Sequence, residues 1–222
     1  MSLLAPAPCK TSSWPIAVGA AGIAAAQFAR CGFDVLAQTG ADKPWYDLVV
    51  TKGTNLLKLA VKASDDGQWS LTQSYLARAA DVSGKKTATE GAIDLWLDIH
   101  GSRTLYCLVQ FEGVALHQMP RIYLATPSEI AQKLRRTVQR LGNSSLYEQY
   151  EWTDADSGFT SIESLPSSWL FSQERVHELL HAQAAPPVSP QAQRKSATAA
   201  NAWSEESASS RRKELREAFL TA

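Results

Sequence analysis

The stretch YDLVVTKGTNLLKLAVKAS, residues 46–64, joins two apolar runs through a short polar turn. The first run is YDLVV (46–50) and the second is NLLKLAVK (55–62), with TKGT between them. Apolar and β-branched residues on both sides of a turn that contains glycine are typical of a β-hairpin, so we predict two antiparallel strands. An acid, Asp47, opens the first strand, and a lysine, Lys62, closes the second.

The two faces of the second predicted strand differ in chemistry. Because side chains alternate along a strand, Lys58, Ala60 and Lys62 share one face. The apolar side chains share the other face: Leu57, Leu59 and Val61. A carboxylate that binds Mg²⁺ and a lysine that orients the attacking water or stabilises the transition state are parts of a metal-dependent phosphodiesterase. The alternative is an ordinary hairpin in which Asp47 and Lys62 form a surface ion pair of little energetic value.

Outward from the hairpin, the patterns predict an α/β domain whose mixed central sheet has helices on both faces. Further strands are expected at 33–38, 104–111 and 121–125. A helix is expected at 14–30, and the best helical signal is TPSEIAQKLRRTVQRLG, 126–142. Thr126 and Glu129 form a capping pattern there, Pro127 takes the first turn and Gly142 ends the helix.

The remaining segments carry weaker signals. We expect a polar turn at 65–76 that continues as a strand, a mobile loop at 77–87 and an edge strand at 146–152. ATEGAIDLWLDIHG (88–101) reads as a helix capped by Thr87, with a strand over IDLWLDI as the alternative. PSSWLFSQERVHELLHAQ (166–183) ends in a helix that begins near Ser172.

Composition divides the chain into three parts. Residues 1–13 are rich in Pro and Ser and are expected to be flexible, and 14–183 form the α/β domain. Residues 184–222 are expected to be a disordered tail that ends in a short amphipathic helix and recruits a protein partner.

Bulk properties exclude several classes of protein. The formal net charge is zero, so a DNA site must rest on a local patch of basic residues. Three widely separated cysteines argue against a disulfide framework or a cysteine-rich zinc site. With neither an export signal nor a membrane span in the sequence, we expect a cytoplasmic protein that does not bind membranes.

The phrase RCGFDV (30–35), Tyr46-Asp47 and Lys62 together resemble the PD-(D/E)xK nuclease superfamily, with its Holliday-junction-resolvase-like and homing-endonuclease-like members. RIYLATPSEI (121–130) also looks like a strand-to-helix phrase common in these proteins, and the resemblance covers about residues 19–135. It implies a restriction-endonuclease-like core and a metal-dependent DNA endonuclease, or a divergent relative, that hydrolyses phosphodiester bonds. A homodimer is among the assemblies that it implies.

The resemblance also implies roles for individual residues. Asp47 and Lys62 would be catalytic, Asp47 and Asp65 would bind Mg²⁺ or Mn²⁺, and Lys58 and Gln68 would contact DNA. Two positions depart from the family pattern. The acid or glutamine two residues before the lysine is Ala60, and the first helix has Ile23 or a neighbour where the family often has a glutamate.

These departures leave two hypotheses on one fold. In the first, a ligand has migrated, and its candidate sources are Asp42, Asp65, Asp66, Gln68 and the carbonyl of Val61. In the second, the chain is a catalytically inactive DNA-binding or scaffold protein. Apolar packing around Ala60 would favour the second hypothesis, and a carboxylate close to Asp47 would favour the first.

A separate motif, HELLH at 177–181, predicts a zinc peptidase as a further alternative. His177 and His181 are four residues apart on a predicted helix, and Glu178 lies between them as a general base. A third ligand would have to come from His117 or Glu163. Solvated histidines on a helix are the simpler interpretation.

Two sets of residues are further candidates for DNA contacts. On the helix at 126–142, Lys133, Arg136 and Arg140 either contact phosphates or form a solvated face. Trp45 and Trp69 flank the hairpin and either stack on bases or pack in the core.

Overall fold

The structure is a computed structural model that describes residues 13–38, 46–82, 87–100, 104–154 and 157–183. The chain divides into two units at Ala184, and the second unit lies outside the described residues. The predictions for the N-terminus, for the tail and for Asp42 and Trp45 therefore fall on residues that the structure does not describe. None of the described helices combines the length and the apolar character needed to cross a membrane.

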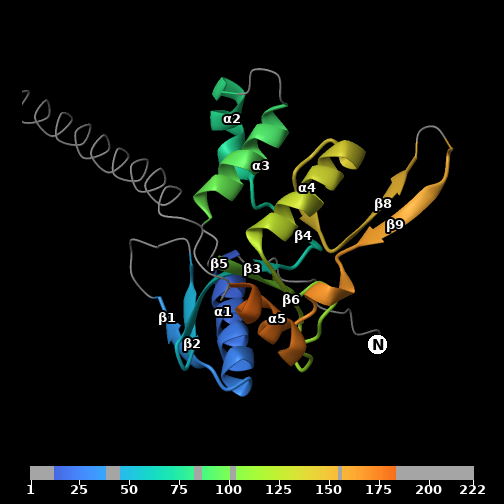
Figure 1. Ribbon diagram of the computed structural model, residues 1–222. Helices are drawn as coiled ribbons and strands as arrows, with labels where there is room; N and C mark the ends of the chain where they lie inside the picture. Colours follow the sequence, from blue (N-terminus) through green and yellow to red (C-terminus); the bar gives the residue numbers. More distant parts are fainter. Residues whose placement is uncertain (1–12, 39–45, 83–86, 101–103, 155–156, 184–222) are drawn as a thin grey trace, which may run out of the picture. The chain divides into compact units, whose positions relative to one another are not determined.

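A five-stranded mixed sheet forms the centre of the first unit, as the sequence predicts (Figure 1). The strand order is β1-β2-β3-β5-β6, in which only β3 and β5 run parallel. The strands are β1 (Asp34–Ala37), β2 (Leu48–Lys52), β3 (Asn55–Ser64), β5 (Thr104–Gln110) and β6 (Arg121–Ala125).

The hairpin at the start of the sheet has a two-residue turn. Lys52 pairs with Asn55, so Gly53 and Thr54 form the connection. Gly53 has a φ of 62°, which is the left-handed conformation required at the first position of a type II′ turn. Because the register follows from this turn, Leu57, Leu59 and Val61 all point to one face of the sheet.

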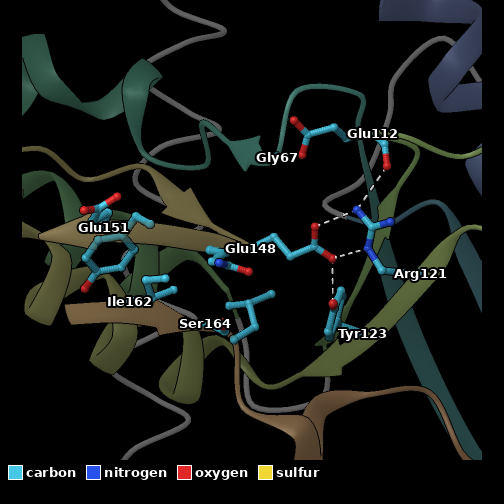
Figure 2. A pocket seen from close by; sticks show the side chains of 11 residues that line it. Gly67, Glu112, Arg121, Tyr123, Glu148, Glu151, Ile162 and Ser164 are labelled. Atoms are coloured by element: carbon cyan, nitrogen blue, oxygen red, sulfur yellow. Dashed lines mark hydrogen bonds and ion pairs between the residues drawn. The ribbon is translucent and has the colours of Figure 1, made fainter. Parts of the chain in front are cut away.

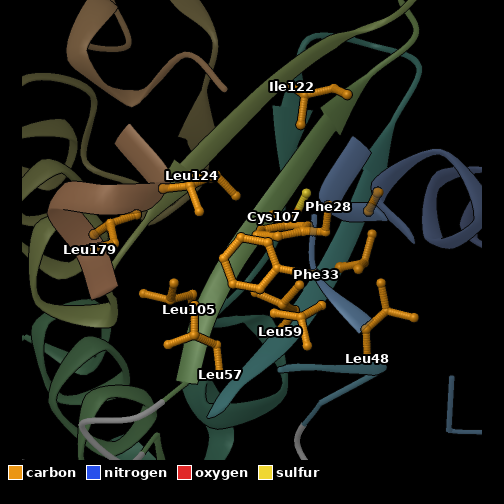
Figure 3. Close-up of a cluster of buried hydrophobic side chains, with 14 of the residues drawn as sticks. Phe28, Phe33, Leu48, Leu57, Leu59, Leu105, Cys107, Ile122, Leu124 and Leu179 are labelled. Atoms are coloured by element: carbon orange, nitrogen blue, oxygen red, sulfur yellow. The ribbon is translucent and has the colours of Figure 1, made fainter. Parts of the chain in front are cut away.

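One apolar cluster fills that face of the sheet, under α1 (Ser13–Arg30) and α5 (Gln173–Gln183). Figure 3 shows Phe28 of α1 and Leu179 of α5 among side chains of the strands. Leu59, Leu105 and Leu124 have 1% exposure or less, and each such side chain contributes about 1.5–3 kcal/mol through burial. The helix predicted at 14–30 is confirmed as α1, which packs on this face of the sheet.

The opposite face carries a second cluster, under α2 (Leu76–Val82), α3 (Ala88–Ile99) and α4 (Pro127–Leu141). Trp96 of α3 and Ile130 of α4 are buried against Tyr106 and Leu108 of β5. Helices thus cover both faces of the sheet, which confirms the predicted architecture (Figure 1).

The two capping predictions are confirmed. The Thr126 hydroxyl accepts the backbone N–H of Glu129, whose carboxylate accepts the N–H of Thr126. Gly142 ends α4 with a φ of 71°. Thr87 and Glu90 form the same capping box on α3, which resolves residues 88–99 as a helix and not a strand.

Three predictions for the loops and edges hold only in part: the polar turn at 65–76 does lead into a strand, but the strand is short, and residues 83–86 of the expected loop are not described. After the short strand β4 (Gln68–Trp69), the chain forms a 3-10 turn, η1 (Gln73–Tyr75), and then α2, where we expected a strand and a mobile loop. Tyr75 and Ala79 are buried in the second cluster, and this packing stabilises the helix. The predicted edge strand 146–152 is two strands, β7 (Leu146–Tyr147), which pairs with β4, and β8 (Gln149–Thr153).

A separate hairpin, β8 with β9 (Thr160–Ser164), extends away from the other described elements (Figure 1). The sequence did not predict β9. After it, a second 3-10 turn, η2 (Ser167–Trp169), buries Trp169 and leads to α5. The hydroxyl of Ser172 accepts the N–H of Arg175 at 3.1 Å, so the predicted start of this helix is confirmed.

Candidate functional site

Asp47 lies immediately before β2 and continues the pairing of β2 with β3. Its N–H donates to the carbonyl of Leu59 at 2.7 Å, and its own carbonyl accepts the N–H of Gln38 at 2.9 Å. Its carboxylate Oδ2 accepts the N–H of Val61 at 2.7 Å. One carboxylate oxygen of the proposed metal ligand therefore stabilises the backbone of the neighbouring strand.

The two lysines of β3 lie on the face that the alternation predicts. Lys58 pairs in register with Val49 and is half-buried, while Lys62 is exposed. The Nζ atom of Lys58 lies 5.0 Å from the centre of the Tyr46 ring, which is a cation–π contact. Because the Val61 N–H donates to the Asp47 carboxylate, Asp47 lies against the residue next to Lys62.

Ala60 lies between these lysines and is 1% exposed. In the parallel pairing of β3 with β5 its partner is Tyr106, which is also 1% exposed. The Tyr106 ring packs 5.3 Å from Trp96, centre to centre, and its hydroxyl is hydrogen-bonded to His100 Nε2 at 2.9 Å. Ala60 thus belongs to a buried cluster that is rich in aromatic side chains.

Burial keeps the side chains of His100 and Tyr106 uncharged. Burial, followed by the charge of Lys62, lowers the pKa of His100 to about 4. Burial raises the pKa of Tyr106, and the charge of Asp47 contributes in the same direction. His100 and Tyr106 are thus neutral at pH 7, in a region that also feels the charges of Asp47 and Lys62. Sequence patterns did not indicate that Tyr106 lies beside Ala60, because that contact depends on the register of the parallel pairing of β3 with β5.

Asp65 and Gln68 lie beyond the end of β3. Asp65 is exposed and four residues past Val61, which corresponds to about 13 Å of extended chain. Asp66 accepts hydrogen bonds from the N–H and the side-chain amide of Gln68, at 3.2 Å each. Gln68 therefore closes a local turn, and the structure does not bring Asp65 to Asp47.

The described residues add little to Asp47 as ligands for a divalent metal ion. Within them, no group of three His, Cys, Asp or Glu side chains is close enough to hold a metal. Oδ2 of Asp47 is already hydrogen-bonded, and Ala60 supplies no donor. Mg²⁺ is held in proteins by one or two carboxylates, with waters and phosphates completing its octahedral shell, so Asp47 would have to bind it with little further help from the described residues.

The HELLH motif also lacks a third ligand in the described part of the chain. His177 and His181 are exposed on α5, and their ring centres are 6.5 Å apart. Glu178 accepts a hydrogen bond from Arg175 at 2.9 Å. Glu163, one proposed third ligand, is bonded to Lys133 of α4 at 2.5 Å.

The basic cluster of α4 is mostly engaged within the protein. Lys133 is buried and donates to Glu163, and Arg140 forms an ion pair with the same carboxylate. Arg140 also stacks on Trp152 at 4.3 Å. These contacts attach the β8–β9 hairpin to α4, so Lys133 is not available to a phosphate.

Trp69 belongs to the core and does not stack on bases. It is 2% exposed and packs edge-on against Tyr123, with ring centres 6.5 Å apart. Its indole N–H donates to the carbonyl of Lys62 at 3.1 Å. Trp69 thereby holds the end of β3 that carries Lys62.

Comparison with known proteins gives a distant likeness in fold. No protein-family model matches the chain, and no curated protein sequence matches it. Among solved structures, the chain is similar to a bacterial homing endonuclease. The matched endonuclease is I-Ssp6803I. The two chains share 14% sequence identity and superpose with a TM-score of 0.42, over 81% of this chain and 100% of the endonuclease. A likeness of this size assigns no role to any residue.

Proposed function

We propose that this chain is a divergent relative of the PD-(D/E)xK nucleases that binds DNA through the exposed Lys62 and the half-buried Lys58 of β3 and does not cleave it. The environment of Ala60 carries this proposal. At the position where the resemblance expects a metal-binding acid, the chain has a methyl group that is 1% exposed beside Tyr106. A carboxylate placed there would be desolvated next to a neutral phenol, which disfavours its charged form.

The role of Asp47 supports the same proposal. Its carboxylate accepts the Val61 N–H, so the residue is needed for the hairpin even where no metal is bound. A retained aspartate is therefore accounted for by structure, and it does not by itself require catalysis.

Lys62 and Lys58 are the candidates for DNA contact. Lys62 is exposed, and Lys58 is held over Tyr46 on the same face of β3. Lysines on a rigid strand contact phosphates as point charges and give affinity that falls as salt rises. Since the net charge of the chain is zero, this contact must be local.

The second candidate function is a metal-dependent DNA endonuclease. The observation that favours it is the closeness of the Asp47 carboxylate to the backbone beside Lys62. It requires a second carboxylate at Asp47. Asp42 in the segment 39–45 is the candidate source, because Asp65 lies beyond the end of β3.

The test is a panel of linear duplex, flap, four-way junction and single-stranded DNA, each with Mg²⁺ or Mn²⁺. The proteins are the full chain, Asp47→Asn, Lys62→Ala and, as a matched control, Lys52→Ala, whose Nζ instead donates to the carbonyl of Cys31 at 2.9 Å. We expect a gel shift without cleavage. Lys62→Ala should weaken binding and reduce the slope of log affinity against log salt by about one, and Lys52→Ala should leave both unchanged.

Two results contradict the proposal. Metal-dependent cleavage that Asp47→Asn and Lys62→Ala both abolish would establish the endonuclease. A folded chain that neither shifts nor cleaves any of the four DNAs would reject both candidate functions.

A further inference from the structure

A cleft of about 580 Å³ lies beside the β8–β9 hairpin, at the β6 edge of the sheet. Its walls come from the loops after β3 and β5, the start of β6, Glu148 and the β8–β9 hairpin. Figure 2 shows the Glu148 carboxylate pointing at Arg121 and Tyr123. The Asp47 carboxylate instead lies against β3, which β5 separates from β6.

A hydrogen-bond network fixes the floor of the cleft. Arg121 donates to both oxygens of Glu148, at 2.6 and 2.8 Å, and the Tyr123 hydroxyl donates to Glu148 at 2.6 Å. Burial alone would raise the pKa of Glu148, but the hydrogen bonds from Arg121 and Tyr123 outweigh it and lower the pKa. The hydrogen bonds from Arg121 and Tyr123 thus favour the ionised form of Glu148, and its carboxylate offsets the positive charge of Arg121.

The remaining charges at the cleft are negative. Glu112 and Glu151 are both exposed, and neither carboxylate takes part in an ion pair with another described residue. Ile162 is 64% exposed and pairs across the hairpin with Glu151. The cleft thus offers acidic groups next to an exposed apolar side chain.

The hairpin repeats this composition over its whole length. Residues 149–164 contain no Lys or Arg, and their acidic residues are Glu151, Asp154, Asp156 and Glu163. On the inner side, Glu163 is held by Lys133, Arg140 and the Tyr150 hydroxyl. These contacts hold the base of the hairpin against α4 and leave its outward face, with Glu151 and Ile162, open to solvent.

We infer that the outward face of β8–β9 and the adjoining cleft dock a basic segment of a partner protein. Charge complementarity selects this occupant: Glu112 and Glu151 attract lysine or arginine, and the exposed Ile162 beside Glu151 contacts an apolar side chain of the partner. Nucleic acid is disfavoured, because these carboxylates repel phosphates. This surface is separate from Lys58 and Lys62 of β3, because β5 lies between β3 and β6.

The test uses the full chain and two probes, acetyl-KIKVKIK-amide and acetyl-EIEVEIE-amide. Binding is measured by fluorescence anisotropy and mapped by NMR shifts of backbone amides. We expect the basic peptide to bind and to shift Glu151, Ile162 and their neighbours, while the acidic peptide does not bind. Glu151→Lys should weaken binding about tenfold, and Ile162→Ser should weaken it about threefold.

Asp34→Lys is the matched control, since it makes the same change of charge at an exposed residue of β1, the opposite edge of the sheet. It should change affinity less than about twofold. The inference is overturned if Asp34→Lys weakens binding as much as Glu151→Lys, since the attraction would then be general. It is also overturned if the basic peptide does not bind, or if the DNA panel and not the peptide shifts the cleft amides.

Discussion

Asp47 supports a prediction that separates structure from catalysis. Its Oδ2 accepts the N–H of Val61 at 2.7 Å, and Val61 is 8% exposed. Asp47→Ala removes the acceptor and leaves a buried N–H unpaired, which destabilises a protein by about 1–3 kcal/mol. Asp47→Asn keeps an acceptor oxygen of the same geometry but loses the charge, and charged acceptors are roughly twice as strong, so we expect a loss of about 0.5–1 kcal/mol.

Urea unfolding of the full chain measures this difference. With a slope of about 2 kcal/mol per molar, Asp47→Ala should lower the midpoint by about 0.5–1.5 M, and Asp47→Asn by at most about half a molar. Hydrogen exchange at the Val61 amide should accelerate in Asp47→Ala and change little in Asp47→Asn. Asp34→Ala, at an exposed position of β1, should stay within about 0.5 kcal/mol of wild type.

Two outcomes would refute the reasoning. If Asp47→Ala were as stable as wild type, the hydrogen bond to Val61 would have no structural value. If Asp47→Asn were as unstable as Asp47→Ala, the charge and not the acceptor would matter. Should the prediction hold, loss of any activity in Asp47→Ala alone would not demonstrate a metal ligand.

Three further predictions concern buried groups. Arg175→Met should lower the free energy of unfolding, measured with urea, by about 2–4 kcal/mol. The guanidinium is 5% exposed and donates to the carbonyl of Leu124 at 3.2 Å and to Glu129 at 2.7 Å, and Arg175→Lys should keep part of this stabilisation. The pKa of His100 is about 4 in the folded chain and 6.5 in the unfolded chain. On acidification the unfolded chain therefore binds the proton first, so the free energy of unfolding decreases as the pH falls from 6.5 to 4. In His100→Asn, the free energy of unfolding should lose about 2–3 kcal/mol less over this pH range than in wild type. Urea unfolding at several pH values measures this, and a pH profile identical to that of wild type would contradict the prediction. Burial raises the pKa of the Cys107 thiol to about 12, so iodoacetamide should label it only after unfolding, as peptide mass mapping would show.

Local signals were sufficient for the hairpin and the capped helices. The side chains of Thr126 and Glu129 each accept the backbone N–H of the other, and Gly53 adopts the positive φ that the turn needs. Residues close together in sequence therefore determine these elements. The helix α2 was missed because Tyr75 and Ala79 take their apolar partners from other elements of the second cluster. The strand β9, TSIES, has almost no apolar pattern and exists because it pairs with β8.

The candidate site was predictable only in part. Alternation placed Lys58, Ala60 and Lys62 on one face, and the structure agrees. What fills the space beside Ala60 depends on Tyr106, 46 positions later, through a parallel pairing that no local pattern specifies. The contact between Lys133 and Glu163 also joins residues that are far apart in sequence. For this reason the sequence predicted a basic surface on α4, whereas Lys133 of α4 holds the β8–β9 hairpin.

The position of α5 in the chain has a consequence for biosynthesis. Val176, Leu179 and Leu180 complete the apolar cluster shared with α1, yet they are made after every strand of the sheet. At about 5–20 residues per second, the ribosome needs about 3–12 s to travel from the end of β6 to the end of α5. During that interval the cluster around Leu105 and Leu124 has α1 but lacks the side chains of α5, so a nascent chain stalled before residue 173 would be a client for chaperones.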